Sequence, residues 1–323
     1  MLIRAGLHRL LEFAGRHATK FLALGVLIGF ALPPLAHAAR PALLPAMLIP
    51  LTLALVRVEW RTLAAYSRSP GLLSAAIGWT LIASPVITWC AVRGLGAPAG
   101  LTEGLTLMAA SAPIFSGAAL ALIVGLDGAL AIVVIVFCTA LIPFTLPTLV
   151  LSLLGLKLEI GLAVFMERLA AMVGTAFAAA WIVRRFLRAE TIERHANLFD
   201  GIAVCLLVVF AIGIMDGVTA YAFARPGYVI LATAAAFVAN IALQVLGTIA
   251  FLRLGLKRAL TLGLLSGNCN MGLVLIALAD KASFEVLVFF GVAQLPMYIL
   301  PALLTPVYRR LIEKTRAEGR GQK

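Results

Sequence analysis

Residues 128–153 read GALAIVVIVFCTALIPFTLPTLVLSL, a run without a single charged side chain. A bilayer core needs roughly 20 consecutive apolar residues per helix, and backbone groups at that depth must find their hydrogen bonds within the helix. The run therefore predicts a membrane-spanning helix. The rest of the chain is similar, since 63% of its residues are hydrophobic, 12% are charged and the mean hydropathy is +1.07. This composition predicts an all-α membrane protein with the lipid bilayer as its partner.

Charges, prolines and glycines divide the chain into ten expected transmembrane helices. They cover 19–36, 41–56, 71–92, 100–123, 128–153, 161–183, 200–219, 226–252, 258–279 and 284–307.

The basic residues favour one side of these spans. With the N-terminus in the cytoplasm, 20 of the 26 Lys and Arg residues fall in cytoplasmic segments, five fall in the opposite loops, and Arg168 lies within a span. Such an excess follows the positive-inside rule. We expect a multi-pass protein of the cell inner membrane with both termini cytoplasmic. Because topology accounts for the net charge of +12, no nucleic-acid partner is expected.

The N-terminal segment, residues 1–18, has an apolar face that suits an interfacial amphipathic helix on the inner leaflet. The basic start and the Ala36-His37-Ala38 triplet also resemble a signal peptide with a small-residue cleavage site. Whether residues 1–38 are processed stays open.

An internal match indicates two repeats. Asp127 is followed sixteen residues later by Pro143, Asp280 is followed sixteen residues later by Pro296, and Phe, Ala and Leu match between them without a gap. Two repeats of five spans are inverted relative to each other, because five is odd. The expected division follows: 1–18 interfacial, 19–185 the first repeat with helix 161–183 opening the second, 186–199 a cytoplasmic linker, 200–310 the remainder, and 311–323 a cytoplasmic tail.

Spans four and nine are interrupted at corresponding places. Span four contains Ser111-Ala112-Pro113-Ile114-Phe115-Ser116-Gly117, and span nine contains Ser266-Gly267-Asn268-Cys269-Asn270-Met271-Gly272. Proline removes a backbone donor and glycine tolerates non-helical dihedrals, so each helix is expected to unwind in mid-membrane. The half-helices beyond the breaks offer positive dipole ends that favour an anion. Paired broken helices point to a midplane binding site, although kinks in packed helices are the alternative.

Candidate substrate-binding residues lie at and around these breaks. Asn240 and Gln244 share a face of span eight because they are four residues apart, and either interhelical hydrogen bonding or cavity lining would suit them. The complete set is Asn270, Asn268, Cys269, Ser266, Ser111, Pro113, Phe115, Ser116, Asn240, Gln294 and Thr80.

The same inspection gives no catalytic, metal or cofactor site. All four histidines map outside the membrane core, so no base stands near the serines of the breaks. The four cysteines lie within apolar runs and show neither pairing nor metal-ligand spacing. We expect a protein that is not an enzyme.

Several motifs resemble the bile acid:sodium symporter family of secondary transporters. They are Pro45-Ala46-Met47-Leu48-Ile49-Pro50-Leu51-Thr52-Leu53 with Glu59-Trp60, Ser84-Pro85, Ser111-Ala112-Pro113, and Gly267-Asn268-Cys269-Asn270-Met271-Gly272-Leu273. The resemblance covers nearly the whole chain. It implies ten transmembrane helices as two inverted repeats of five, a panel domain of spans 1, 2, 6 and 7, and a core domain in which broken helices 4 and 9 cross at the substrate site.

The resemblance also locates the family's sodium ligands, and most of them are replaced here. They fall at Leu265, Cys269, Ala118, Ala119, Ala131 and Ile135, with a glutamine position at Thr80, and only Asn270 keeps a ligand-type residue. Aliphatic side chains offer no oxygen to a hard cation. We therefore do not expect sodium to drive this protein through those positions.

The function that these observations favour is secondary active transport of a small organic anion, bile-acid-like or another carboxylate, by alternating access. A channel or uniporter, or a non-transporting membrane sensor on the same fold, is the alternative, and an intramembrane enzyme is less favoured. The sequence does not indicate the substrate, the coupling ion, the direction of transport or the oligomeric state.

Overall fold

The computed structural model describes residues 11, 13, 15, 17–66, 69–155, 161–278 and 281–321, with side chains up to Glu313. The expected interfacial helix over residues 1–18 falls almost entirely outside this part of the chain, and so does Asp280.

Every regular element in the described ranges is a helix, which confirms the all-α membrane fold at this level. The elements are α2 (Ala18–Ala31), α3 (Pro33–Ala39), η1 (Arg40–Ala42), α4 (Leu43–Val56), α5 (Trp60–Tyr66), α6 (Pro70–Gly78), η2 (Trp79–Ala83), α7 (Ser84–Gly94), α8 (Ala99–Ala110), α9 (Ser116–Ile123), α10 (Gly128–Leu154), α11 (Leu162–Phe186), α12 (Ala189–Arg194), α13 (Ala196–Gly213), α14 (Val218–Ala224), α15 (Pro226–Ala250), η3 (Leu252–Leu254), α16 (Leu256–Gly267), α17 (Met271–Leu278) and α18 (Phe284–Gly321).

Seven helical runs of the described chain are long and apolar enough to cross a membrane. They are Pro33–Val56, Pro70–Gly94, Gly128–Leu154, Leu162–Phe186, Ala196–Ala224, Pro226–Ala250 and Phe284–Glu313. The other apolar segments are shorter. They are α2 and the interrupted pairs α8 with α9 and α16 with α17, which occupy the places expected for spans one, four and nine.

The first break in the helical chain differs from the prediction. The expected spans 19–36 and 41–56 put it after residue 36, whereas α2 ends at Ala31 and helix continues from Pro33 to Val56. Leu32 adopts φ −124° and ψ 75°. A residue that precedes proline avoids the helical region, and proline suits the first position of the next helix. Residue 32 therefore ends one helix and begins another.

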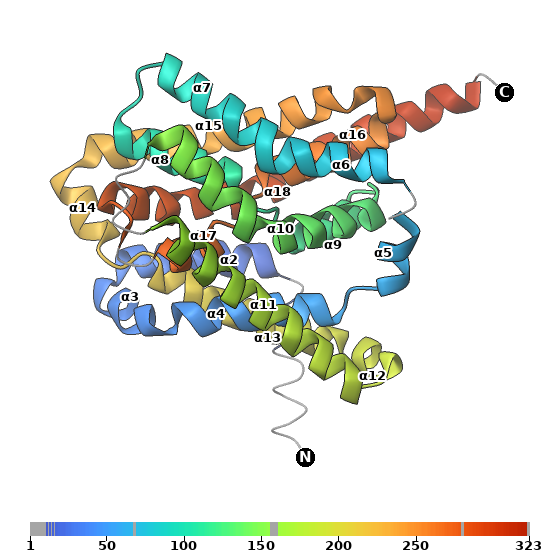
Figure 1. The fold of residues 1–323 in the computed structure, drawn as a ribbon, viewed down its shortest axis with the longest axis horizontal. Coiled ribbons are helices and arrows are strands. Elements are labelled where there is room, and N and C mark those ends of the chain that lie inside the picture. The colour runs from blue at the N-terminus through green and yellow to red at the C-terminus, as the bar shows by residue number, and fades with distance from the viewer. Residues whose placement is uncertain are drawn as a thin grey trace.

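The helices form two groups in Figure 1, in which α2, α3, α4, α11 and α13 lie below α6, α7, α15 and α16. In the lower group α13 packs against both α2 and α4, and α11 packs against α4. In the upper group α15 packs against α16 and α18, and α7 packs against α8. Contacts of α18 with α2, and of α17 with α4 and α11, join the two groups.

Helices α10 and α18 make the centre of the molecule. The apolar window of α18 is 72% buried and that of α10 is 61% buried, against 28–39% for the other five long runs. Phe289 and Phe290 of α18 and Ile135 and Ile142 of α10 are fully buried. The outer helices keep large apolar side chains exposed, as a lipid-facing surface requires.

Candidate functional site: the crossing of two interrupted helices

The two interrupted helices meet through their backbones. Pro113, between α8 and α9, lies opposite Cys269, between α16 and α17, in an antiparallel bridge. Ile114 N–H donates to the carbonyl of Asn268 at 2.9 Å, and Asn270 N–H donates to the carbonyl of Ala112 at 2.7 Å. Unwound backbone within a membrane is tolerated only where its polar groups are satisfied, and each break supplies partners for the other. The predicted interruptions are confirmed, and they lie in contact.

Both second half-helices begin beside this bridge. Helix α9 starts at Ser116 and α17 starts at Met271, three residues after Pro113 and two after Cys269. The N-terminal end of a helix carries a partial positive charge and unpaired amide donors. The crossing therefore combines two positive helix ends, and no residue of the segments 111–117 and 266–272 carries a charge of its own.

A chain of buried amide groups connects the crossing to α18. Asn240 Nδ2 donates to the carbonyl of Gly267 at 2.6 Å, and Gln244 Nε2 donates to Asn240 Oδ1 at 2.6 Å. The Tyr308 hydroxyl donates to Gln244 Oε1, also at 2.6 Å. Asn240 and Gln244 share a face of α15 as the sequence predicts. Tyr308 was missed, because no spacing in the sequence relates it to residues 64 positions away.

Ser266 is held from another direction by Trp79. The indole Nε1 of Trp79 donates to Ser266 Oγ at 2.9 Å, and Ser266 Oγ donates to the carbonyl of Leu262 at 2.8 Å. Trp79 opens η2, a π-helical turn that also contains Thr80. The Thr80 hydroxyl donates to the carbonyl of Ala76 in its own helix. A π-turn widens a helix locally and frequently occurs at functional sites. Trp79, which donates to Ser266, stands at the start of such a turn.

Two buried amide side chains, Asn268 in the second break and Gln294 in α18, have an oxygen without a donor in the described chain. Asn268 Nδ2 donates to Leu264 O at 2.8 Å and Gln294 Nε2 donates to Phe290 O at 3.2 Å, but Asn268 Oδ1 and Gln294 Oε1 receive no hydrogen bond in the described chain. Each residue is 1% exposed. Leaving a buried acceptor unpaired costs about 1–3 kcal/mol. Among the predicted site residues, these two have acceptor capacity left for a ligand.

The remaining candidates separate into buried and accessible groups. Ser111, Cys269 and Asn270 are buried in this conformation. The Ser111 hydroxyl donates to Leu107 O and the Cys269 thiol to Ser266 O, so both groups are turned toward their own helices. Ser116 is exposed and Phe115 is half-buried. The accessible side of the crossing is therefore the start of α9.

Helices α9 and α17, which follow the two breaks, differ in how far other helices cover them. A Cβ on Gly272, in the first turn of α17, would lie 2.9 Å from both Met47 Sδ and Phe210 Cζ. Helices α4 and α13 thus cover the start of α17. By contrast Ser116, the first residue of α9, is exposed. The start of α17 is thus covered by other helices, whereas the start of α9 is exposed at Ser116.

Most of the positions that the resemblance assigns to sodium ligands hold aliphatic side chains. Leu265 Cδ2 and Ile135 Cδ1 lie 3.0 and 3.9 Å from where a Cβ on Gly117 would stand. Ala118 and Ala131 are also buried, and Ala119 is exposed. None of these side chains has an oxygen, and in the described ranges no group of three or more His, Cys, Asp or Glu residues could hold a metal ion.

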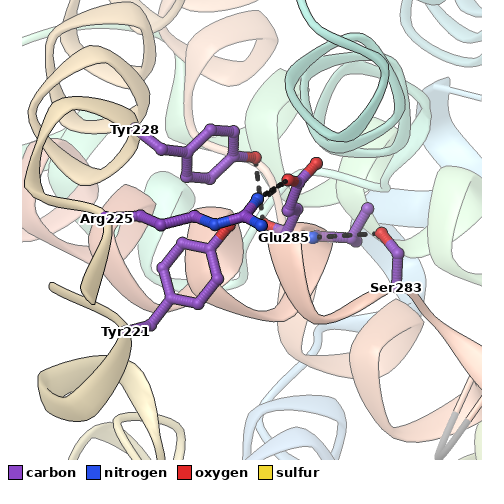
Figure 2. Close-up of polar contacts among 6 residues, drawn as sticks. Tyr221, Arg225, Tyr228, Ser283 and Glu285 are labelled. Carbon is purple, nitrogen blue, oxygen red and sulfur yellow. Dashed lines mark hydrogen bonds and ion pairs between the residues drawn. The ribbon is translucent and has the colours of Figure 1, made fainter.

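Polar contacts fasten α18 near its N-terminal end, as Figure 2 shows. The Tyr221 hydroxyl donates to Glu285 Oε1 at 3.2 Å, and Arg225 forms an ion pair with the same oxygen at 3.4 Å. The Tyr228 hydroxyl donates to the carbonyl of Glu285, and Ser283 Oγ accepts from Val286 N–H. These contacts tie α14 and the start of α15 to α18.

A similar contact fastens the start of α10. The Tyr66 hydroxyl, at the end of α5, lies 3.2 Å from both carboxylate oxygens of Asp127, and Asp127 Oδ1 accepts from Leu130 N–H at 2.9 Å as the N-cap of α10. Burial, and then the charge of Asp127, raise the pKa of Tyr66 above its usual value of 10.0. In both cases a tyrosine from a seven-residue helix donates to a carboxylate at a helix start.

These features define a helical membrane protein in which two interrupted helices cross. No family model matches the chain, and no curated protein matches it. The resemblance to the bile acid:sodium symporter family therefore stays a hypothesis that rests on the sequence motifs.

Proposed function

We propose that this protein is a secondary active transporter of a small organic anion that works by alternating access. The observation that carries the proposal is the backbone bridge between the two broken helices, beside which the start of α17 is covered and Ser116 at the start of α9 is exposed. A site at the junction of two half-helices, open toward one end only, is what a transporter needs in one of its two access states.

We further propose ten spans in two inverted repeats, and element boundaries support this. Three pairs of landmarks are each 156 residues apart: Pro70 and Pro226 open α6 and α15, Pro113 and Cys269 form the bridge, and Gly128 and Phe284 open α10 and α18. The short helices α5 and α14 also correspond, with seven residues each. The offset of 156 residues between these landmarks is three residues longer than the 153-residue offset between Asp127 and Asp280 in the sequence match.

The offset of 156 also relates the two hydrogen bonds of the bridge. Ile114 corresponds to Asn270, and Ala112 corresponds to Asn268, so exchange of the repeats converts one bond into the other. Every antiparallel bridge has this local two-fold relation, so the support for inverted repeats comes from the Pro70–Pro226 and Gly128–Phe284 landmarks, which share the offset of the bridge.

The chemistry of the crossing favours an anion. The positive N-terminal ends of α9 and α17 lie at the two breaks, whose residues carry no charge. The side chains of Asn268, Asn270 and Ser116 add polar groups to the same place. Helix ends of this kind bind carboxylates and phosphates without a cationic side chain. We propose that the carboxylate of an organic substrate occupies this place.

The charge distribution gives the access direction. With a cytoplasmic N-terminus, α9 lies in the cytoplasmic half of span four and α17 in the outer half of span nine. The uncovered side then faces the cytoplasm, and the covering residues Met47 and Phe210 close the outer side. We propose that this conformation is inward-open, in a multi-pass protein of the inner membrane.

The test of the site is transport by the purified protein in proteoliposomes. Candidate organic anions are first screened by the thermal stabilisation that they cause, since a ligand of the folded state raises the melting temperature. Asn270→Ala and Asn268→Leu should then weaken substrate uptake, while Asn197→Ala, at an exposed position in α13, should not. Unchanged uptake in both site variants would reject the crossing as the site.

Two further measurements separate the alternatives. A transporter gives saturable uptake that an opposite gradient of substrate accelerates, whereas a channel gives a flux without counterflow. Replacement of sodium by potassium at equal pH and potential should leave uptake unchanged, because most of the positions that the resemblance assigns to sodium ligands are aliphatic. Loss of uptake without sodium would overturn this proposal on coupling.

A further inference from the structure

A hollow of about 430 Å³ lies where α11 ends. The chain leaves the helix at Leu187, with φ −102° and ψ 131°, and turns into the short α12. Three arginines line the hollow, namely Arg184, Arg185 and Arg188, and no acidic residue does. Its apolar wall includes Phe186, Leu187 and Ile192.

The three arginines have different roles. Arg184 NH1 donates to the carbonyls of Val56 and Val58 at 2.6 and 2.9 Å, which anchors the wall of the hollow to the end of α4. Arg185 and Arg188 are exposed, and neither forms an ion pair with a carboxylate in the part of the chain that the structure describes. Two guanidinium groups beside a hollow are therefore available to an anion.

An exposed apolar strip on α11 lies next to the hollow. Trp181 is 65% exposed, Ile182 48% and Phe186 82%. Large exposed aromatic side chains at the end of a spanning helix are typical of the membrane interface, where their rings lie at the level of the lipid headgroups. The positive-inside distribution assigns this end of α11 to the cytoplasmic leaflet. A molecule with acyl chains along the strip would thus bring its polar end to the arginines.

We propose that the hollow is a binding site for the headgroup of an anionic phospholipid. The phosphate would interact with Arg185 and Arg188, since arginine pairs with phosphate through two parallel N–H groups, and the acyl chains would lie against Ile182 and Phe186. A soluble phosphate ester shares the headgroup chemistry but cannot use the apolar strip. The site is separate from the helix crossing, so it stands whether or not the protein transports an organic anion.

The test uses the full chain in a neutral detergent and measures its melting temperature. Dioleoylphosphatidylglycerol, dioleoylphosphatidylcholine and glycerol 3-phosphate are titrated separately. We expect phosphatidylglycerol to raise the melting temperature at concentrations at which the other two have no effect. The double variant Arg185→Gln, Arg188→Gln should weaken the apparent affinity on the order of 25-fold, since each arginine at an anionic surface contributes roughly fivefold.

A matched control removes the same charge elsewhere. Arg253→Gln with Arg310→Gln changes two exposed arginines that do not line the hollow, and it should leave the affinity for phosphatidylglycerol unchanged. Equal weakening in both double variants would show diffuse attraction to the whole basic face and overturn the site. Stabilisation by glycerol 3-phosphate as strong as that by phosphatidylglycerol would overturn the lipid assignment.

A second variant keeps every charge in place. Phe186→Ser changes an exposed side chain, so folding should be preserved, and it should weaken binding of phosphatidylglycerol because the acyl chains lose an apolar contact. Full affinity for the lipid in this variant would also contradict the proposal.

Discussion

Pro113 and Cys269 lie opposite each other in an antiparallel backbone bridge although 156 residues separate them in the chain. The bridge pairs backbone groups that the two helix breaks leave without partners in their own helices. Its position depends on how closely α15 can approach α16, because Asn240 and Gln244 reach the break only across that contact.

A glycine sets this approach, and its substitution is the first prediction. A Cβ on Gly263 would lie 2.5 Å from Gln244 O and 2.9 Å from the backbone nitrogen of Thr248, so α15 and α16 would have to separate. We expect Gly263→Ala to destabilise the protein by about 1–3 kcal/mol. The measurement is the free energy of unfolding in detergent.

The control for Gly263 is Gly174, within α11, where a Cβ meets no atom within 4 Å. Gly174→Ala should stabilise the helix by about 0.5–1 kcal/mol, because alanine loses less backbone entropy than glycine. Equal effects of the two substitutions would show that the α15–α16 contact is looser than described.

The second prediction concerns Asn240. Asn240→Leu would leave the Gly267 carbonyl without its donor and Gln244 Nε2 without its acceptor. Each buried group left unpaired costs about 1–3 kcal/mol, so unfolding by denaturant should occur at a clearly lower concentration. Asn197→Leu, at an exposed site of α13, serves as the control and should have little effect. A stability equal to that of the control would contradict the chain of hydrogen bonds.

The third prediction separates a structural from a binding role of Gln294. Its Oε1 is buried and accepts no hydrogen bond in the described chain. Gln294→Met keeps the length of the side chain and removes that oxygen, so the melting temperature should stay unchanged or rise. If the oxygen receives a donor from the substrate, the KM for uptake should increase about tenfold, as expected for one lost hydrogen bond. A large loss of stability with unchanged KM would assign Gln294 to packing.

The sequence predicts most spans because long charge-free runs such as 128–153 can satisfy their backbone in lipid only as helices. It also predicts the two breaks, since Pro113 and Gly267 disturb a helix from within. The predicted boundary of the first helix is wrong because Pro33 keeps Leu32 out of the helical region, so the helix ends before residue 36. Trp79 and Tyr308 could not be assigned to the site, because only the packing of distant helices brings them to Ser266 and Gln244.

The repeat offset illustrates the same limit. The sequence match pairs Asp127 with Asp280, whereas the proposed 156-residue offset pairs Asp127 with Ser283, and the side chains of Asp127 and Ser283 both accept from the N–H group three residues later. A helix cap can be an aspartate or a serine with the same geometry. Under the proposed offset, residue identity alone does not indicate the correspondence of Asp127 and Ser283, which shows only in their hydrogen bonds.

The fourth prediction tests the uncovered side of the crossing. Ser116 is exposed, while Cys269 on the other strand of the bridge is 2% exposed. With the exposed Cys90 and Cys205 replaced by serine, Ser116→Cys should react with a small polar maleimide much faster than Cys269 does. The reagent should act from the cytoplasmic side.

The control for this labelling is a cysteine on the lipid-facing surface. Ile241 of α15 is 40% exposed, and Ile241→Cys should react slowly because a polar reagent and a thiolate are both rare in hydrocarbon. If Ser116→Cys reacted as slowly as Ile241→Cys, the start of α9 would face lipid and not a water-filled opening, and the inward-open assignment would be wrong.

The fifth prediction concerns the Tyr66–Asp127 contact and its dependence on pH. Because the pKa of Tyr66 is raised in the folded protein, the folded state holds the phenolic proton more tightly than the unfolded state does. This contribution to stability is complete below about pH 10, the pKa of an unperturbed tyrosine, and it is lost as the pH rises through the folded-state pKa.

Tyr66→Phe should lower the free energy of unfolding by about 1–3 kcal/mol at neutral pH, since the hydroxyl donates to a charged group. It should also reduce the alkaline decrease in stability. Asp127→Asn, which keeps an oxygen for the N-cap but removes a charge that raises the pKa of Tyr66, should make that decrease smaller. If the wild-type and Tyr66→Phe proteins showed parallel stability curves above about pH 10, the hydrogen bond would not contribute in the way that the geometry implies.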